Sequence, residues 1–204
     1  MVSFTCTLCG RCCRMYWVPI THIDALRITD RTGLDSVDFT ALYNAEVYES
    51  RMPKILLNGK TYFLGLKRRN DGYCVFNAKG PCTIHRFKPI VCRFYPFKYE
   101  VRNGMVRISI LPEAVGFCPG LIPDDKPIPA SMVAELSRLA RIRSLERRLF
   151  TAAVAEWNEE QGLKTESREK LLDFLLDSAE RDLKVEKQVV SNNLYLSILP
   201  LRTR

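Results

Sequence analysis

Hydrophobic residues recur at helical spacing through the last third of the chain. Beyond residue 130 they return every three or four positions, which predicts a long amphipathic helix. The positions are Met132, Leu136, Leu139, Ile142, Leu145, Leu149, Ala153 and Trp157. We expect Gly162 to follow the end of this helix and Thr165 to cap another, which carries Leu172, Leu175, Leu176 and Leu183. The apolar stretch 194–201 fits a helix and a strand equally.

Two further helices are expected before residue 50. Thr21 is followed three residues later by Asp24, the pattern of a capped helix start, and Gly33 is placed to end the helix near residue 31. His22 would then lie in the first turn, as a surface or cap residue rather than a metal ligand. Scattered apolar residues between positions 34 and 49 predict a second helix there.

Two β-hairpins are expected at Asn-Gly pairs, because a two-residue type I′ turn needs two residues with positive φ. Asn58-Gly59 separates apolar segments 55–57 and 61–63, and Asn103-Gly104 separates 97–101 and 106–110. In the second hairpin this turn pairs Val101 with Val106, Tyr99 with Ile108 and Phe97 with Ile110. All six side chains then share one face, so turn and pattern predict the same register.

These elements predict an α+β fold with short β-hairpins and N-terminal helices, followed by a C-terminal helical region. Four prolines occur between residues 119 and 129, which is typical of a linker. We therefore expect a cysteine-rich metal-binding domain at 1–120, a proline-rich linker at 121–130 and a helical region at 131–204. The helices would pack on the first domain or on a protein partner.

Composition narrows the class of protein. Of 204 residues, 47% are hydrophobic and 26% are charged, which is ordinary for a globular chain. The first twenty residues contain no apolar segment of a signal peptide, and no apolar run reaches the roughly 18–20 residues of a membrane helix. We expect a cytoplasmic protein with no membrane partner.

Eight cysteines carry the candidate chemistry. In a reducing cytosol, clustered cysteines are more often metal ligands than disulfides, and soft thiolates suit zinc and iron–sulfur clusters. The first three follow the C-x2-C-x2-C spacing of bacterial ferredoxins, and a cysteine-proline pair of the kind that ends the ferredoxin run occurs far downstream at Cys118-Pro119. The predicted metal ligands are Cys6, Cys9, Cys12, Cys13, Cys74, Cys82, Cys92 and Cys118.

Positive charge is concentrated in the half that carries the cysteines. The chain has net charge +8; residues 131–204 hold 13 basic and 12 acidic residues, which leaves 18 and 11, or +7, for residues 1–130. A four-iron cluster on four thiolates carries about −2, so two of them lower +7 to about +3. Nucleic acid is therefore the less favoured partner. Its candidate patches, residues 67–69 and the arginines between 138 and 148, fit a solvated face better.

The central motifs are the most specific in the chain: Tyr73-Cys74-Val75-Phe76, then Gly80-Pro81-Cys82 with His85, then Lys88-Pro89 and Cys92-Arg93-Phe94-Tyr95-Pro96. With the opening CxxCxxCC and Phe117-Cys118-Pro119, residues 4–120 resemble the YkgJ-like CxxCxxCC cysteine-cluster family. That resemblance implies a zinc- or iron-chelating domain related to flagellin lysine-N-methylases. Lys88 replaces the usual arginine, and His85 stands where tyrosine is common; we expect His85 to hydrogen-bond rather than to bind metal.

Two functions remain open at this stage. The favoured one is an iron–sulfur protein, with a 4Fe-4S cluster, that serves in electron transfer or protein lysine methylation. The alternative is a structural zinc module that docks a protein, through the C-terminal helices, or nucleic acid. A thiol oxidoreductase ranks last, and no sequence motif assigns a reaction. Eight thiols could form two four-thiolate sites, or one such site beside redox-active or substrate-facing cysteines. Because adjacent side chains diverge, one of Cys12 and Cys13 should join Cys6, Cys9 and a remote cysteine, and the remaining cysteines should form a second site or bridge to the first.

Overall fold

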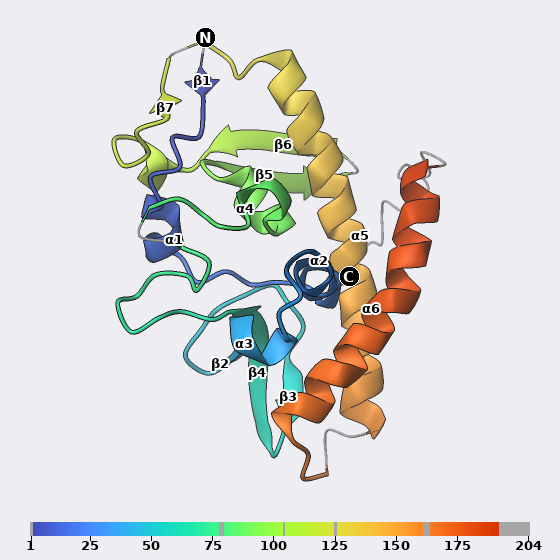
Figure 1. Ribbon diagram of the computed structural model, residues 1–204. Helices are drawn as coiled ribbons and strands as arrows, with labels where there is room; N and C mark the ends of the chain where they lie inside the picture. Colours follow the sequence, from blue (N-terminus) through green and yellow to red (C-terminus); the bar gives the residue numbers. More distant parts are fainter. Residues whose placement is uncertain (1, 78–79, 104, 125, 161–163, 192–204) are drawn as a thin grey trace.

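Two long helices, α5 (Ala130–Glu160) and α6 (Arg168–Ser191), pack side by side, and the rest of the chain lies against them (Figure 1). The computed structural model describes residues 2–77, 80–103, 105–124, 126–160 and 164–191. Helices and small antiparallel sheets are combined, so the expected α+β class is confirmed. In the described part of the chain, no helix has the length and apolar character needed to span a bilayer.

Helix α2 (His22–Thr32) begins and ends where the sequence predicts. The Thr21 hydroxyl accepts a hydrogen bond from the Asp24 N–H at 3.1 Å, and the Asp24 carboxylate accepts one from the Thr21 N–H at 3.3 Å. This capping box satisfies backbone donors that a helix start otherwise leaves unpaired. At the other end, Gly33 adopts left-handed geometry with φ of 70°.

The predicted helix over residues 34–49 is wrong. Only α3 (Ser36–Phe39) is helical, and β2 (Thr40–Asn44) follows it directly. β2 pairs antiparallel with β4 (Lys60–Leu66), which also pairs with β3 (Ile55–Leu57), so the strand order is β2-β4-β3. The partner strand satisfies the backbone of β2 across five residue pairs. This tertiary pairing overrides a weak helical pattern.

Both predicted hairpins are present. In the first, Leu57 lies opposite Lys60, so Asn58 and Gly59 form a two-residue turn, with φ of 50° and 74°. In the second, β5 (Phe97–Arg102) and β6 (Met105–Ile110) pair in the expected register: Val101 with Val106, Tyr99 with Ile108 and Phe97 with Ile110.

In the upper part of Figure 1 the second hairpin lies beside the two ends of the cysteine-rich half. The cysteine-rich half also contains the short helices α1 (Arg11–Met15) and α4 (Ile90–Phe94), and two 3₁₀ turns at His85–Phe87 and Pro112–Ala114. β1 (Ser3–Phe4) pairs antiparallel with β7 (Leu121–Ile122). β7 thus falls within the stretch predicted as a linker.

The C-terminal helices follow the predicted pattern, with one correction at a cap. α5 covers all of the predicted positions from Met132 to Trp157. α6 begins at Arg168, and the Ser167 hydroxyl accepts a hydrogen bond from the Lys170 N–H at 3.1 Å. Ser167 therefore caps this helix, where Thr165 was predicted to. Gly162 and residues 194–201 lie outside the described residues.

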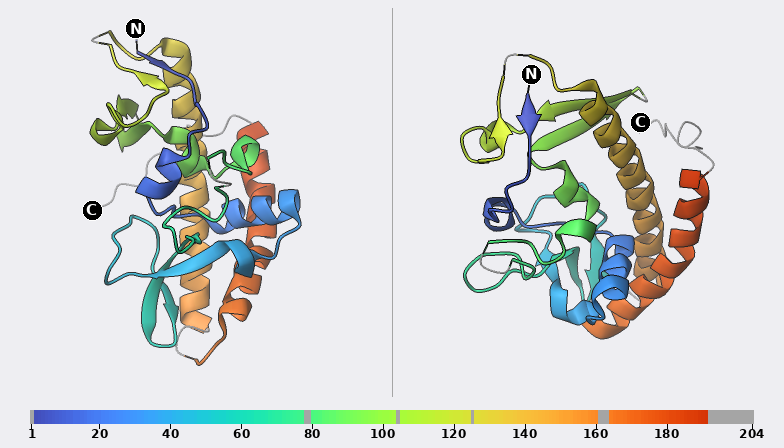
Figure 2. Two further views of the ribbon diagram at one scale, coloured as in Figure 1. Left: turned by 60° about the vertical axis from the view of Figure 1, so that its left-hand side comes forward. Right: turned by 45° about the horizontal axis from the view of Figure 1, so that its top comes forward.

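Helix α5 packs against both ends of the molecule (Figure 2). Its first half contributes to a hydrophobic cluster with α4 and β5. Its second half contributes to a larger cluster with β3, β4 and α6, where Trp157 and Phe150 are fully buried. Because the apolar stripe of α5 is buried inside the chain, the helices pack on the cysteine-rich half.

His22 is buried, which corrects the expectation of a surface or cap position. The residue has 0% exposure. Its Nε2 lies 2.8 Å from the Asp182 carboxylate of α6, and its ring stacks on Phe150 of α5 with centroids 5.2 Å apart. The side chain therefore joins three helices.

A buried charged network joins the same three helices. Arg27 of α2 donates to Glu146 of α5 and to Glu186 of α6. Arg143 of α5 lies 3.7 Å from Asp24, and the Glu146 side chain is fully buried. Three carboxylates thus face two guanidinium groups, which favours one carboxyl that keeps its proton near neutral pH.

This network predicts that the folded protein loses stability as pH rises towards 8. Burial first, and then the Asp24 carboxylate, raise the pKa of Glu146 from 4.5 to about 8. Between these values the folded state holds a proton that the unfolded chain has released, so the free energy of unfolding falls with increasing pH. Thermal unfolding of the metal-loaded protein between pH 5 and 9 measures the effect. Glu146→Gln should flatten this profile, and an unchanged profile would contradict the assignment.

Candidate metal centre

The first four cysteines lie on an extended segment and the short helix that follows it. Cys6 and Cys9 are exposed, whereas Cys12 and Cys13 are half-buried on α1. Gly10 precedes the helix with φ of 70°, and its carbonyl accepts a hydrogen bond from the Cys13 N–H at 3.0 Å. The left-handed glycine turns the chain so that both adjacent cysteines enter one short helix.

Gly10 also packs tightly against a second loop. A Cβ at this position would lie 2.3 Å from Asn77 Nδ2 and 2.4 Å from the Gly80 carbonyl oxygen. The Asn77 amide is itself fixed, because it donates to the Gly80 carbonyl and accepts from the Gly80 N–H. The N-terminal cysteines are therefore held directly on the loop that precedes Cys82.

The three central cysteines approach α1 from another side. The Cys74 N–H donates to the Cys13 carbonyl at 2.9 Å, which joins the two segments directly. Cys82 forms an isolated β-bridge with Asn77. Cys92 lies on α4, and the first N–H of that helix, from Ile90, donates to the buried Asp24 carboxylate at 3.3 Å.

Six of the eight predicted ligands line one cavity of about 360 Å³. They are Cys6, Cys12, Cys13, Cys74, Cys82 and Cys92. Cys9 and Cys118 do not contribute to its lining. Among the described residues, no three cysteine, histidine, aspartate or glutamate side chains lie close enough together to bind a single ion. The thiols thus surround a space and do not meet at a point.

The pKa values of the two adjacent cysteines, Cys12 and Cys13, are shifted in opposite directions. A hydrogen bond from Cys12, aided by Asn77 and Lys88, lowers the pKa of Cys13 to about 6. The same hydrogen bond and burial raise the pKa of Cys12. Burial raises the pKa of Cys74 to about 12. Cys13 is therefore the thiol most ready to bind metal as a thiolate at neutral pH.

Lys88 is the cation that faces the thiols. It lines the cavity, and its positive charge lowers the pKa of both Cys12 and Cys13 against the opposing effect of burial. Its Nζ lies 3.2 Å from Nε2 of His85, which also lines the cavity. This contact fits the hydrogen-bonding role expected for His85. Lys88 retains the positive charge of the arginine it replaces but not the planar fork.

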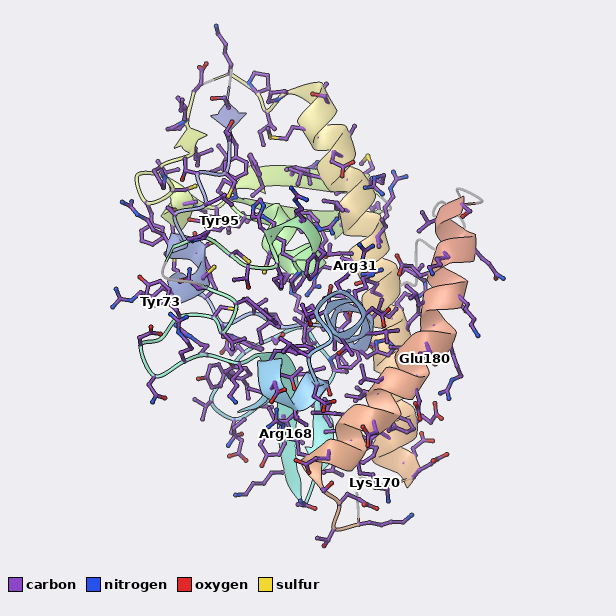
Figure 3. All side chains as sticks on the ribbon, viewed as in Figure 1. Arg31, Tyr73, Tyr95, Arg168, Lys170 and Glu180 are labelled. Carbon is purple, nitrogen blue, oxygen red and sulfur yellow. The ribbon has the colours of Figure 1, made fainter. Side chains whose placement is uncertain are left out.

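Two tyrosines at the cavity have buried hydroxyl groups. The Tyr95 hydroxyl is buried and has no hydrogen-bond partner within the described part of the chain, and the Tyr16 hydroxyl is buried beside Glu113. Their ring centroids lie 6.0 Å apart. Burial raises the pKa of both phenols, that of Tyr16 to about 12. Figure 3 shows Tyr95 on the side of α4 that faces α1. Sequence reasoning missed both tyrosines, although Tyr95 lies inside a quoted motif.

Several residues of the two candidate basic patches make hydrogen bonds or ion pairs within the protein. Arg68 donates to the Arg14 and Gly72 carbonyls, and Arg69 donates to Asp71 and to the Asn77 carbonyl. In the second patch, Arg143 is only 7% exposed and faces Asp24. These contacts support a structural role for Arg68, Arg69 and Arg143.

The thiols of this cavity are donors that suit both zinc and an iron–sulfur cluster. Zinc binds four thiolates at about 2.3 Å, which places the sulfurs about 3.8 Å apart. In a four-iron cluster each thiolate binds a different iron, so the sulfurs are held farther apart around an inorganic core. In the described residues the thiols line a cavity without converging on one point, so the spacing of the sulfurs is the feature that distinguishes the two arrangements.

A family model described as "CxxCxxCC: Putative zinc- or iron-chelating domain" matches residues 5–113, more than half of the chain. The chain belongs to the CxxCxxCC family. An uncharacterized protein of Methanocaldococcus jannaschii, MJ0661, is 25% identical over 122 residues, which are 59% of each chain. The chain therefore spans about three fifths of that relative. No solved structure is significantly similar. Membership in this family supports metal binding by the CxxCxxCC domain.

Proposed function

We propose that the CxxCxxCC domain of this chain holds an iron–sulfur centre, of the 4Fe-4S type, and works in electron transfer. The observation that carries the proposal is the cavity of about 360 Å³ lined by six cysteines. When bound, such a cluster accepts and releases single electrons. Four thiolates hold one such cluster, and the candidates are the eight cysteines, of which Cys9 and Cys118 lie outside the cavity lining.

The chain's own residues support this role in two ways. Lys88 and Lys98 line the cavity and offset the negative charge of a thiolate-bound cluster. Cys6 and Cys9 are exposed, which brings one edge of the ligand set to the protein surface. An electron-transfer partner protein would approach this edge rather than the C-terminal helices, whose apolar faces are packed inside the chain.

Electron transfer is favoured over protein lysine methylation by the charge of the cavity. Among the described residues that line it, the charged side chains are Lys88 and Lys98, and no aspartate or glutamate is present. A substrate lysine would therefore meet like charge with no carboxylate to receive it. The structural zinc module is the alternative that the first experiment must exclude.

Anaerobic purification followed by metal analysis tests the proposal. We expect a brown protein with a broad visible absorption band, and iron and acid-labile sulfide in equal amounts. Dithionite should bleach the band, and an artificial electron acceptor should restore it. A colourless protein with stoichiometric zinc and no sulfide would refute the iron–sulfur assignment and favour the zinc module.

A further inference from the structure

The start of the chain is paired with residues just beyond Cys118. Ser3 lies opposite Ile122 and Phe4 opposite Leu121, and the Thr5 N–H donates to the Gly120 carbonyl at 3.0 Å. Cys6 and Cys118 are the next cysteines beyond this paired stretch on the two segments. The backbone pairing therefore brings the C-x2-C-x2-C segment to the cysteine that is farthest from it in sequence.

Two contacts fix this pairing closely. A Cβ on Gly120 would lie 1.9 Å from the Thr5 carbonyl oxygen, so only glycine permits the approach of the two backbones. Arg11, at the start of α1, donates from Nη1 to the Phe117 carbonyl at 2.9 Å, and its guanidinium lies 5.9 Å from the Phe117 ring centroid. The residue before Cys118 is thus tied to the helix that carries Cys12.

The Tyr95 hydroxyl is evidence for a ligand on the side of the molecule that carries Cys118. Cys118 is 9% exposed and belongs to the hydrophobic cluster against which Tyr95 packs. The Tyr95 hydroxyl is buried and has no partner in the described residues, although a buried hydroxyl normally donates to an acceptor.

The remaining four cysteines are associated with one another instead. The Cys74 N–H donates to the Cys13 carbonyl at 2.9 Å. All four line the cavity, together with Cys6 and Cys12. Cys12 and Cys13 both line the cavity, and each can serve a different one of two neighbouring centres.

We propose that Cys6, Cys9, Cys12 and Cys118 hold a second four-thiolate iron–sulfur centre, beside a first one held by Cys13, Cys74, Cys82 and Cys92. The Tyr95 hydroxyl donates a hydrogen bond to a thiolate of this second centre and acts as a positioning residue. The inference rests on the proposed function, because both centres take the same kind of cluster.

Iron and sulfide analysis of matched cysteine variants tests the two-centre arrangement. The unchanged protein should hold about eight irons and eight sulfides per chain, and Cys118→Ser and Cys92→Ser about four of each. Electron paramagnetic resonance of the reduced samples should show two interacting centres in the unchanged protein and a different single centre in each variant. Circular dichroism checks that both variants remain folded.

The outcomes separate this inference from the proposed function. About four irons in the unchanged protein, or the same residual centre in both variants, would overturn the second centre and leave the iron–sulfur assignment standing. Stoichiometric zinc without labile sulfide would overturn both. A variant that does not fold is replaced by Cys9→Ser for the second centre or Cys82→Ser for the first, with the same expected halving.

Two tyrosine variants, Tyr95→Phe and the control Tyr62→Phe, test the positioning role of Tyr95. A hydrogen bond to a thiolate stabilises the more negative, reduced cluster, so Tyr95→Phe should shift the midpoint potential of the Cys118-dependent centre to a more negative value. The other centre should keep its potential. Tyr62→Phe, in the β2-β4-β3 sheet and outside the cavity lining, should change neither. Equal shifts of both centres, or no shift with Tyr95→Phe, would refute the hydrogen bond.

Discussion

Replacing Gly10 by alanine should abolish loading of the metal centre and lower the free energy of unfolding by more than about 3 kcal/mol. The new Cβ would overlap the buried Asn77 amide and the Gly80 carbonyl, at 2.3 and 2.4 Å. Relief of this overlap separates α1 from the loop before Cys82. The cysteines on the two sides of the cavity then no longer surround a common space.

Gly33 provides a matched control for this variant. It has the same φ of 70°, but no atom lies within 4 Å of the position that a Cβ would take. Gly33→Ala therefore carries only the conformational penalty of a left-handed residue, about 1–2 kcal/mol, and should retain a full metal load. Denaturant unfolding and iron analysis of both variants measure the difference. Full iron in Gly10→Ala would show that the close approach does not build the site.

Replacing Arg27 by leucine should lower the free energy of unfolding by about 3–5 kcal/mol, because it leaves buried carboxylates without their partner. Arg27 donates to Glu146, whose side chain is fully buried, and to Glu186, whose side chain is 8% exposed. With Arg27 removed, both carboxylates lie near Asp24 with only Arg143 to balance them. Helix α2 would lose the contacts of Arg27 to α5 and α6 and keep the pair of Asp24 with Arg143.

A surface ion pair provides the control for the Arg27→Leu variant. Lys170, with a side chain 54% exposed, pairs with Glu166 at 2.7 Å on the first turn of α6. Lys170→Gln should change stability by less than about 1 kcal/mol. Thermal unfolding at pH 9 and at pH 7 distinguishes the two effects, since Glu146, whose pKa burial raises to about 8, is protonated at the lower pH, which should reduce the loss in Arg27→Leu. A loss below about 1 kcal/mol at both pH values would contradict the role of the network.

Residues close together in the sequence were sufficient to predict the elements whose formation depends on neighbouring residues alone. Thr21 and Asp24 predicted the start of α2, and Asn58-Gly59 and Asn103-Gly104 predicted two hairpins together with the register of the second. In each case the deciding residues lie within a few positions of the feature. Strand β2 was missed because its identity depends on β4, about twenty residues away, and residues 34–49 alone carry a weak helical pattern.

The candidate site was predicted in its composition but not in its arrangement. The spacing of the cysteines identified all eight as ligand candidates, and that assignment stays a prediction. Their grouping depends on contacts between distant segments, such as the pairing of Thr5 with Gly120 and the close fit of Gly10 against Gly80. The tyrosine hydroxyls could be recognised as part of the site only after the structure showed that they are buried. Sequence spacing carries none of this information.

Pairing of β1 with β7 has a consequence for how the protein matures. The strand at Ser3–Phe4 leaves the ribosome before its partner at Leu121–Ile122 has been translated. At synthesis rates of about 5–20 residues per second, the intervening stretch of the chain takes roughly 6–24 s to make. For that interval Cys6 and Cys9 are bare thiols on a nascent chain. In the proposed arrangement, assembly of the centre that uses Cys6, Cys9 and Cys118 would therefore follow translation of the first 120 residues.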